Sequence, residues 1–214
     1  MNMLKSDPAP AAALSLEAAS EDLAALAWLH ESERDVITLC RLHAAGFPGG
    51  LTVAPPDMPA LAEMDQALSV IREVGEGQRA ALQDDLNADF ASIYLTHALR
   101  ASPCESVWLD DESLMMQGPS FAVRDRYREH GLKAANWRHI ADDHLANELA
   151  FIAHLLAHGH AREACRFIDD HLMQWLPRFA GRVADRASTR FYAALATLTL
   201  HVIERLRQQL NACV

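Results

Sequence analysis

The sequence has 214 residues, of which 50% are hydrophobic, and its 19 basic and 29 acidic side chains give a net charge of -10. A chain of this length can bury a substantial core as one large domain or two small subdomains. The negative charge repels phosphate backbones and favours cationic partners, so nucleic acid is not an expected ligand. The apolar run from Phe191 to Ile203 is shorter than the roughly 20 residues of a membrane helix, so no stable membrane insertion is expected.

The N-terminal stretch from Met1 to Ala13 is rich in alanine and proline and lacks the basic and apolar regions of a signal sequence. We therefore expect residues 1–19 to form a flexible tail. The cysteines are scattered without close pairing, which is typical of reduced thiols in a cytoplasmic protein. They are Cys40, Cys104, Cys165 and Cys213.

Most of the chain has the apolar periodicity of helices, and no stretch of alternating β-branched residues predicts a sheet. Glycine and proline mark the breaks between helices. We expect Ser20 to cap the first helix, Ser32 and Asp35 to allow its division, and Pro177 to end a later one. The expected helices are Glu21 to about Ala45, Asp57 to Gly75, Gln78 to about Leu99, Pro119 to His130, the run after Asp142 that Gly159 closes, Ala161 to Leu176, and Ser188 to Leu210.

The expected fold is all-α, a single compact bundle of many helices. It divides into an N-terminal helical part, residues 20–130, and a C-terminal helical part, residues 144–214. Residues 131–143 form a hinge between them, because the stretch from Lys133 to Ala141 reads as irregular. A connector of this length also permits exchange of the C-terminal helices between two chains, so a monomer and a domain-swapped homodimer both stay open.

An acidic corner directly precedes the most apolar helix of the C-terminal part. Asp142, Asp143 and His144 stand at the start of this helix. Asp142 is well placed to cap it, because a short carboxylate accepts free backbone N–H groups and its charge opposes the positive helix end. The apolar stripe that follows consists of Leu145, Leu149, Ile152 and Leu156.

Four segments in a fixed order carry a resemblance to a known family. They are Ser102-Pro103-Cys104-Glu105-Ser106-Val107-Trp108, then Asp142-Asp143-His144 with Phe151 and His154, then His171-Leu172 with Trp175-Leu176-Pro177-Arg178-Phe179, then Phe191-Tyr192. In this order they resemble the TorD/DmsD (TorD/DmsD/NarJ-like) family of redox-enzyme maturation chaperones. The match covers about residues 90 to 205. Ala141 stands where the family's hinge motif usually has a proline, which predicts a looser hinge.

The resemblance implies an all-helical, non-catalytic, cytoplasmic chaperone without a cofactor of its own. Members of this family bind the twin-arginine signal peptide or the folded body of a molybdenum-cofactor enzyme. They hold this precursor until the cofactor is inserted, before export. The identity of the client enzyme, the part of it that is bound and any binding of nucleotide stay open.

A receptor for a twin-arginine peptide needs carboxylates beside apolar surface, because the peptide presents two guanidinium groups and then an apolar segment. Asp142, Asp143 and Glu105 are the candidate carboxylates, and His144 and Ser106 lie beside them in the sequence. His144 could be held protonated by the two acids or could orient one of them. Tyr94 and Trp108 are candidate apolar walls.

A purely structural interpretation of the same residues stays open. In it Asp142 caps the helix, Asp143 is solvated, His144 bonds a neighbouring loop, and Glu105 and Ser106 anchor their own loop.

Two other functions stay open as well. The first is a metal-dependent helical enzyme that uses Asp142, Asp143, His144, His154 and His158, since the last two have the i, i+4 spacing of metal ligands. The second is a helical adaptor for an unrelated partner. A phosphate-binding loop is not expected, because Gly75-Glu76-Gly77 is followed by neither a lysine nor a third glycine.

Overall fold

The computed structural model describes residues 14–134 and 140–212. Within these ranges the fold is all-α, as the sequence predicts, and β-pairing is limited to an isolated antiparallel bridge between Cys104 and His144. The helices are α1 (Leu16–Glu31), α2 (Val36–Ala44), α3 (Pro59–Glu73), α4 (Arg79–Phe90), α5 (Ser106–Leu109), α6 (Gly118–Glu129), α7 (Leu145–Ala157), α8 (Ala161–Phe167), α9 (Met173–Arg186) and α10 (Arg190–Ala212). None of them is long and apolar enough to cross a membrane.

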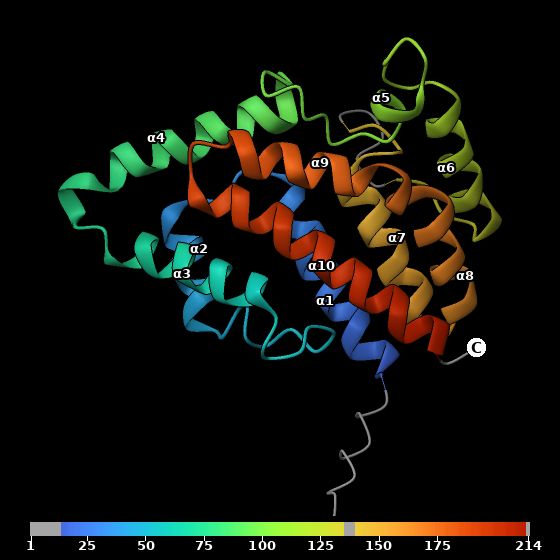
Figure 1. The fold of residues 1–214 in the computed structure, drawn as a ribbon, viewed down its shortest axis with the longest axis horizontal. Helices are drawn as coiled ribbons and strands as arrows, with labels where there is room; N and C mark the ends of the chain where they lie inside the picture. The colour runs from blue at the N-terminus through green and yellow to red at the C-terminus, as the bar shows by residue number, and fades with distance from the viewer. Residues whose placement is uncertain (1–13, 135–139, 213–214) are drawn as a thin grey trace, which may run out of the picture.

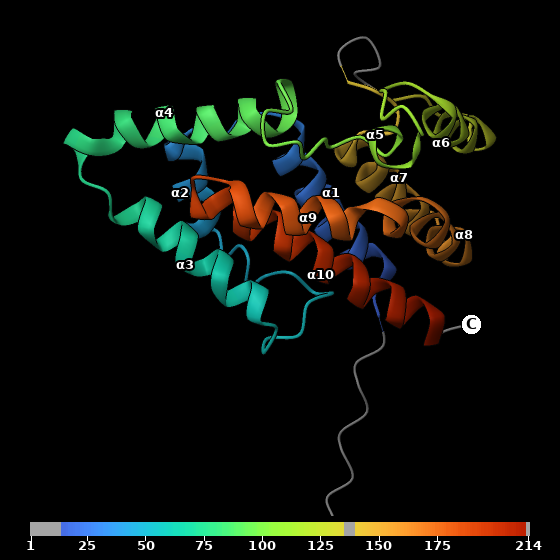
Figure 2. The same cartoon turned by 45° about the horizontal axis from the view of Figure 1, so that its top comes forward.

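The core lies between long helices from both ends of the chain. Figure 1 shows α10 running diagonally across the molecule with α9 beside it and α3 on its other side. Helix α1 packs along α7 behind them, and the turned view in Figure 2 keeps α1 close to α7 and α10. Each of these helices buries an apolar stripe, with Leu23 of α1, Leu149 of α7 and Leu198 of α10 fully excluded from solvent.

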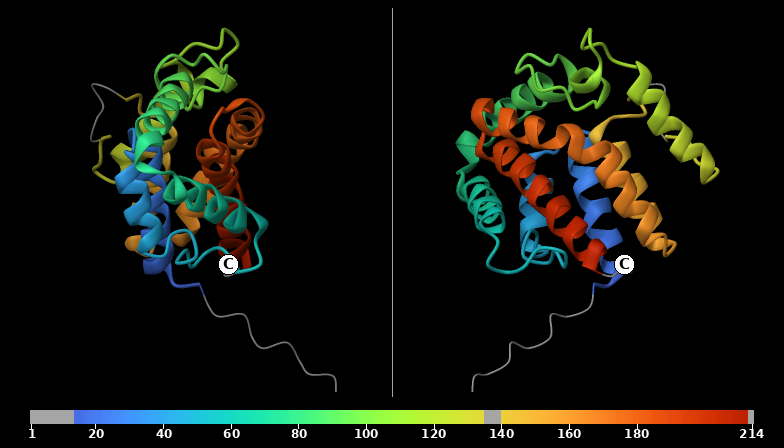
Figure 3. Two further views of the ribbon diagram at one scale, coloured as in Figure 1. Left: turned by 90° about the vertical axis from the view of Figure 1, so that its left-hand side faces the viewer. Right: turned by 45° about the vertical axis from the view of Figure 1, so that its right-hand side comes forward.

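Helices on both sides of residues 131–143 therefore bury one shared core, because α1 packs on α7 and α3 on α10. The division into an N-terminal part, a hinge and a C-terminal part stays a prediction, as does exchange of the C-terminal helices. Residues 135–139 of the expected hinge lie outside the described ranges. Helix α6 lies at the edge of the bundle, where Figure 3 shows it standing apart from the central helices.

The first helix begins earlier than the sequence indicated. Ser15 caps α1 by accepting a hydrogen bond from the Ala18 N–H at 3.3 Å, so residues 15–19 belong to the helix and not to the expected tail. Residues 1–13 of that tail lie outside the described ranges. Ser20 is not the cap, and its hydroxyl instead donates to the Ala153 carbonyl of α7 at 2.8 Å. Division at Ser32 and Asp35 is confirmed, since Asp35 caps α2.

Pro177 does not end a helix, contrary to expectation. It lies inside α9, close to the start of that helix. A π-turn, η3 (Ile168–Leu172), separates α8 from α9 and has already shifted the backbone hydrogen-bonding register there. Pro177 has no N–H to donate to the Met173 carbonyl, yet the chain continues as a helix to Arg186.

Two buried aspartates tie distant segments to the bundle. Asp22 of α1 accepts hydrogen bonds from the backbone N–H groups of Thr52 and Val53 at 2.7 and 2.8 Å, which fixes the loop between α2 and α3. Asp89 of α4 accepts from the N–H groups of Ser188 and Thr189 at 3.0 and 2.6 Å. Asp89 thereby satisfies free N–H groups at the start of α10 as a local N-cap would.

Replacement of Asp89 tests this link. We expect Asp89→Ala to lower the free energy of unfolding by about 3 kcal/mol, because a buried charge-assisted hydrogen-bond group is lost and backbone donors are left unpaired. Exposed Asp84→Ala on the same helix should change it by less than about 0.5 kcal/mol. Urea denaturation followed by circular dichroism measures both, and equal values for the two variants would contradict the proposed link.

Candidate functional site

The segment around Glu105 and the acidic corner lie side by side, as the predicted site requires. The Glu105 N–H donates to the Asp143 carbonyl at 3.0 Å, and the Leu145 N–H donates to the Pro103 carbonyl at 2.8 Å. This short antiparallel pairing forms the bridge between Cys104 and His144. It fixes the start of α7 against the start of α5, although the two segments are far apart in sequence.

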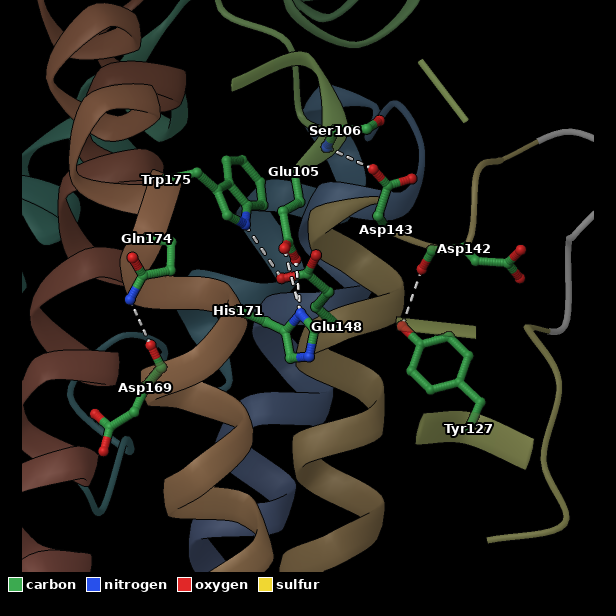
Figure 4. Close-up of polar contacts among 10 residues, drawn as sticks. All are labelled: Glu105, Ser106, Tyr127, Asp142, Asp143, Glu148, Asp169, His171, Gln174 and Trp175. Atoms are coloured by element: carbon green, nitrogen blue, oxygen red, sulfur yellow. Dashed lines mark hydrogen bonds and ion pairs between the residues drawn. The ribbon is translucent and has the colours of Figure 1, made fainter. Parts of the chain in front are cut away.

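Asp143 is fully buried and bonds the neighbouring segment. Its Oδ2 accepts a hydrogen bond from the Ser106 N–H at 2.7 Å (Figure 4). The interpretation of Asp143 as a solvated side chain is therefore wrong. Its other oxygen, Oδ1, has no hydrogen-bond partner among the described residues, and neither has the buried Ser106 hydroxyl. Asp143 thus holds the first turn of α5 with one oxygen only.

Asp142 holds α6 and does not cap α7. Its carboxylate accepts a hydrogen bond from Arg124 Nε at 2.7 Å, and its carbonyl accepts from the Tyr127 hydroxyl at 2.9 Å. Figure 4 shows this carboxylate pointing away from the interior of the corner. The cap of α7 is His144, whose Nδ1 accepts from the Ala146 N–H at 3.1 Å. Asp142 lies two residues before the capping position, too early in the chain for that role.

His144 is neutral, which corrects the expectation that neighbouring acids hold it protonated. Burial, together with the nearby His97, lowers the pKa of His144 to about 3. The two preceding carboxylates are directed to Arg124 and to the Ser106 N–H, so neither balances a charge on the imidazole. Because Nδ1 accepts the capping hydrogen bond, the proton of the neutral ring resides on Nε2.

A second pair of buried acids lies under the corner. The Glu105 carboxylate is 3.1 Å from His171 Nδ1 of η3, and Glu148 of α7 accepts a hydrogen bond from Trp175 Nε1 of α9 at 3.3 Å. Figure 4 shows the two carboxylates facing each other between His171 and Trp175. Burial and the negative charge of Glu105 raise the pKa of Glu148 well above its usual value. Glu148 therefore carries a proton.

Glu148, His171 and Trp175 were not among the predicted site residues. One signal for Glu148 was present in the sequence, since it lies on the helix face that also carries Leu145 and Ile152, where an acid is otherwise costly. His171 and Trp175 belong to the segments that carry the family resemblance. Their contacts with the two glutamates depend on the π-turn of η3, which no sequence pattern indicated.

The two predicted apolar walls have different surroundings. Tyr94 is buried, with its hydroxyl 2.6 Å from His30 Nδ1 and its ring centroid 6.0 Å from that of His144. Trp108 is half-buried and donates from Nε1 to the Ser102 carbonyl at 2.8 Å. The Arg182 guanidinium lies over the Trp108 ring, 4.8 Å from its centroid.

The predicted site residues thus meet around one corner, where they join α4, α5, α6 and α7. Six of the seven are buried, namely Tyr94, Glu105, Ser106, Asp142, Asp143 and His144. Each of these six bonds or packs against another part of the protein, as Glu105 and Ser106 do in the structural interpretation. In this conformation these buried residues connect the surrounding segments to one another, an arrangement that we call the closed joint. Ala141, at the position of the family's proline, is also fixed, because its carbonyl accepts from the Asn147 side chain at 2.8 Å.

An apolar groove of about 410 Å³ lies next to this joint, between α1 and α7. Tyr127 and Asn147 belong to both features, since they line the groove and bond the backbone of Asp142 and Ala141. Most of the lining is small or aromatic: Ala24, Ala27, Trp28, Tyr127, Ala134, Ala146, Ala150, Phe151 and Ala153. Alanine side chains leave the space open, and Trp28 is 38% exposed at its edge.

The ligand set of the alternative metal enzyme is engaged in other contacts. Asp142 and Asp143 are bonded to Arg124 and the Ser106 N–H, and His158 bonds the His154 carbonyl at 2.8 Å. Among the described residues, no group of three or more histidine, cysteine or acidic side chains is arranged to hold a metal ion.

Comparisons with known proteins bear out the resemblance. The model of a family described as nitrate reductase delta subunit matches residues 54–181. A chaperone protein TorD of Vibrio cholerae serotype O1 is 28% identical over 204 residues, which cover 90% of each chain. A TorD of Actinobacillus succinogenes is 30% identical over 66% of this chain and 81% of its own. The Tat proofreading chaperone DmsD of Salmonella typhi is 32% identical over 53% of this chain and 56% of its own.

The neutral state of His144 predicts a specific loss of stability in acid. His144 becomes charged below about pH 6.5 in the unfolded chain but only near pH 3 in the folded one, so its contribution is lost as the pH falls between these values. Asparagine keeps a cap acceptor and does not titrate. Below pH 6.5 we expect the free energy of unfolding of the wild type to fall by up to about 1.4 kcal/mol more per pH unit than that of His144→Asn. Urea denaturation at several pH values measures this, with exposed His158→Asn as the control that should follow the wild type.

The protonated Glu148 predicts the opposite dependence of stability on pH, with a loss as the pH rises. Its folded pKa is raised, so its contribution is fully present below about pH 4.5 and is lost as the pH rises toward the folded pKa. A glutamine amide can donate to Glu105 and accept from Trp175 without titrating. We expect Glu148→Gln to become progressively more stable than the wild type from pH 5 to pH 8 in the same denaturation assay. A constant difference between the two proteins across this range would contradict a protonated Glu148.

Proposed function

We propose a client, the protein that this chain assists, from its family and role. The chain belongs to the nitrate reductase delta subunit family, and it is a chaperone rather than an enzyme. The proposed client is the precursor of a molybdenum-cofactor enzyme that carries a twin-arginine signal peptide. The chaperone binds this precursor in the cytoplasm, through the signal peptide, the mature body or both. It supports insertion of the cofactor before the enzyme is exported.

The observation that carries this proposal is the similarity to TorD, which extends over 90% of each chain. The aligned region is long enough to include both the closed corner and the helices of the groove. The DmsD relative is a Tat proofreading chaperone, which supports a signal peptide as the recognised element. The acidic net charge of -10 favours a ligand with adjacent arginines.

The groove between α1 and α7 is the proposed binding site for the apolar segment of the signal peptide. Its volume of about 410 Å³ and its alanine-rich wall suit a run of apolar side chains. Burial of such a run stabilises a complex by about 25 cal/mol for each Å² of apolar surface removed from water. An apolar signal segment of roughly 7–15 residues offers enough surface for this term to be large.

We propose that the corner serves this site mainly by holding its walls in place. Asp142 fixes α6, Asp143 and Ser106 fix α5, and His144 fixes the start of α7. Glu105 and Tyr94 support the same joint from within, and Trp108 keeps part of its ring accessible at the surface. Direct contact between the buried carboxylates and a peptide would require the joint to open.

A filled groove tests this proposal. The probe is a fluorescein-labelled synthetic peptide with two adjacent arginines followed by about ten apolar residues. Ala150→Phe places a ring in the groove, and we expect it to raise the Kd at least about tenfold, because the ring occupies the binding site of the apolar segment. Ala81→Phe, at an exposed position of α4, should leave the Kd unchanged. Fluorescence anisotropy measures both values.

The outcomes separate the parts of the proposal. Absence of binding to the wild-type chain would contradict recognition of a signal peptide. If the wild type binds the peptide and the Ala150→Phe and Ala81→Phe variants bind it with equal affinity, the groove is not the binding site of the apolar segment.

A further inference from the structure

The loop between α5 and α6 exposes an unusual number of large apolar side chains. With the last residue of α5 and the first turn of α6 it forms the segment from Leu109 to Phe121, called the loop below, and Figure 1 shows it projecting at the top of the molecule. Of the nine large hydrophobic side chains that are exposed within the described ranges, five belong to this segment: Leu109 (39%), Leu114 (48%), Met115 (41%), Met116 (51%) and Phe121 (48%). Single exposed hydrophobic residues are normal, whereas a local concentration of them indicates an interaction surface.

The same loop carries accessible carboxylates. Asp110 is occupied, since its Oδ2 accepts hydrogen bonds from the N–H groups of Glu112 and Leu114 at 3.0 and 3.3 Å. The side chains of Asp111 and Glu112 are exposed and make no hydrogen bond or ion pair with any described residue. The acids of the corner differ, because Asp142 and Asp143 are buried and bonded within the protein. Asp111 and Glu112 therefore combine free negative charge with adjacent apolar surface.

The backbone of the loop makes two tight turns. Ser113 and Met116 have φ values of 54° and 57°, in the left-handed region that non-glycine residues rarely adopt. Asp110 closes the first of these turns, and the Gln117 side chain donates to the Met115 carbonyl at 3.2 Å in the second. The exposed shape is thus held by specific contacts. Methionine is well suited to such a surface, because its flexible and polarisable side chain adapts to different partners.

We propose that this loop, Leu109–Phe121, is the docking surface for the arginine pair and the first apolar residues of the client's signal peptide. The inference rests on the proposed function and names the surface that recognises the charged end of the ligand. Charge complementarity carries the choice of partner, since two guanidinium groups match the carboxylates of Asp111 and Glu112. Of the nearby cations, Arg124 is paired with Asp142, whereas Arg178 and Arg182 keep their charge where they lie over the Trp108 ring.

The loop and the groove can be reached by one peptide. Phe121 of the loop and Tyr127 of the groove both lie on α6, about 9 Å apart along its axis at a rise of 1.5 Å per residue and about 120° apart around it. An extended peptide covers about 3.4 Å per residue, so three or four residues cover the axial distance and a few more pass around the helix. The arginine pair can occupy the loop while the apolar segment continues toward α1 and α7.

Paired substitutions test the loop with the same peptide. We expect D111N/E112Q and L114S/M116S each to raise the Kd about tenfold, because one variant removes the charge and the other the apolar contact. D111N/E112Q should also remove most of the dependence of the Kd on salt, and replacement of both peptide arginines by lysine should weaken wild-type binding. Matched controls are the adjacent exposed acids in D84N/D85N and the exposed apolar residue in I37S, which should bind like the wild type. All these positions are exposed, and circular dichroism checks the fold of every variant.

The results separate this inference from the proposed function. Absence of binding to the wild type defeats both. Wild-type binding that neither loop variant weakens more than the controls overturns the loop and leaves signal-peptide recognition standing. If a loop variant keeps its affinity for the peptide but light scattering gives it a different molecular mass from the wild type, the loop forms a contact between two copies of the chain. As an independent measurement, a photoreactive group beside the peptide arginines should label residues 109–121, and labelling confined to other segments would overturn the proposal.

Discussion

The arrangement of the corner depends on one constraint: a buried carboxylate must be hydrogen-bonded, paired with a cation, or neutralised by a proton. Each of these three solutions occurs here. Asp143 accepts the Ser106 N–H, Asp142 pairs with Arg124, and Glu148 carries a proton beside Glu105 and accepts from Trp175. Because each partner belongs to a different helix or loop, meeting this requirement fixes α5, α6, α7 and α9 relative to one another.

This constraint also determines which acids can recognise a ligand. A carboxylate already bonded to an internal donor would have to exchange that partner for an arginine, and the vacated donor would be left unpaired in the interior. Exposed carboxylates such as Asp111 and Glu112 bear no such cost. Acidic residues that stand together in the sequence near an apolar helix therefore divide into two roles, one structural at the corner and one available for recognition on the loop.

The parts of the fold that follow from helical periodicity could be predicted from the sequence. The stripes of α1, α7 and α10 and the break at Ser32 have local signals, whereas the expectation that Glu105 and Asp143 form one site came with the family resemblance. The caps could not be assigned in the same way. Ser20, Asp142 and Pro177 each look like a helix boundary, but Ser20 and Asp142 bond other helices and Pro177 lies inside α9. Such roles depend on tertiary partners that a local pattern does not contain.

Glu148 marks the limit of sequence reasoning most clearly. An acid on the buried face of a helix signals a polar partner, yet its position does not say whether that partner is a cation, a backbone N–H or a second acid. Here the partner is Glu105, and the arrangement is stable because Trp175 and His171 occupy the remaining sides of the pair. The proton on Glu148 removes one negative charge from the interior under the corner, where two adjacent unprotonated carboxylates would be costly.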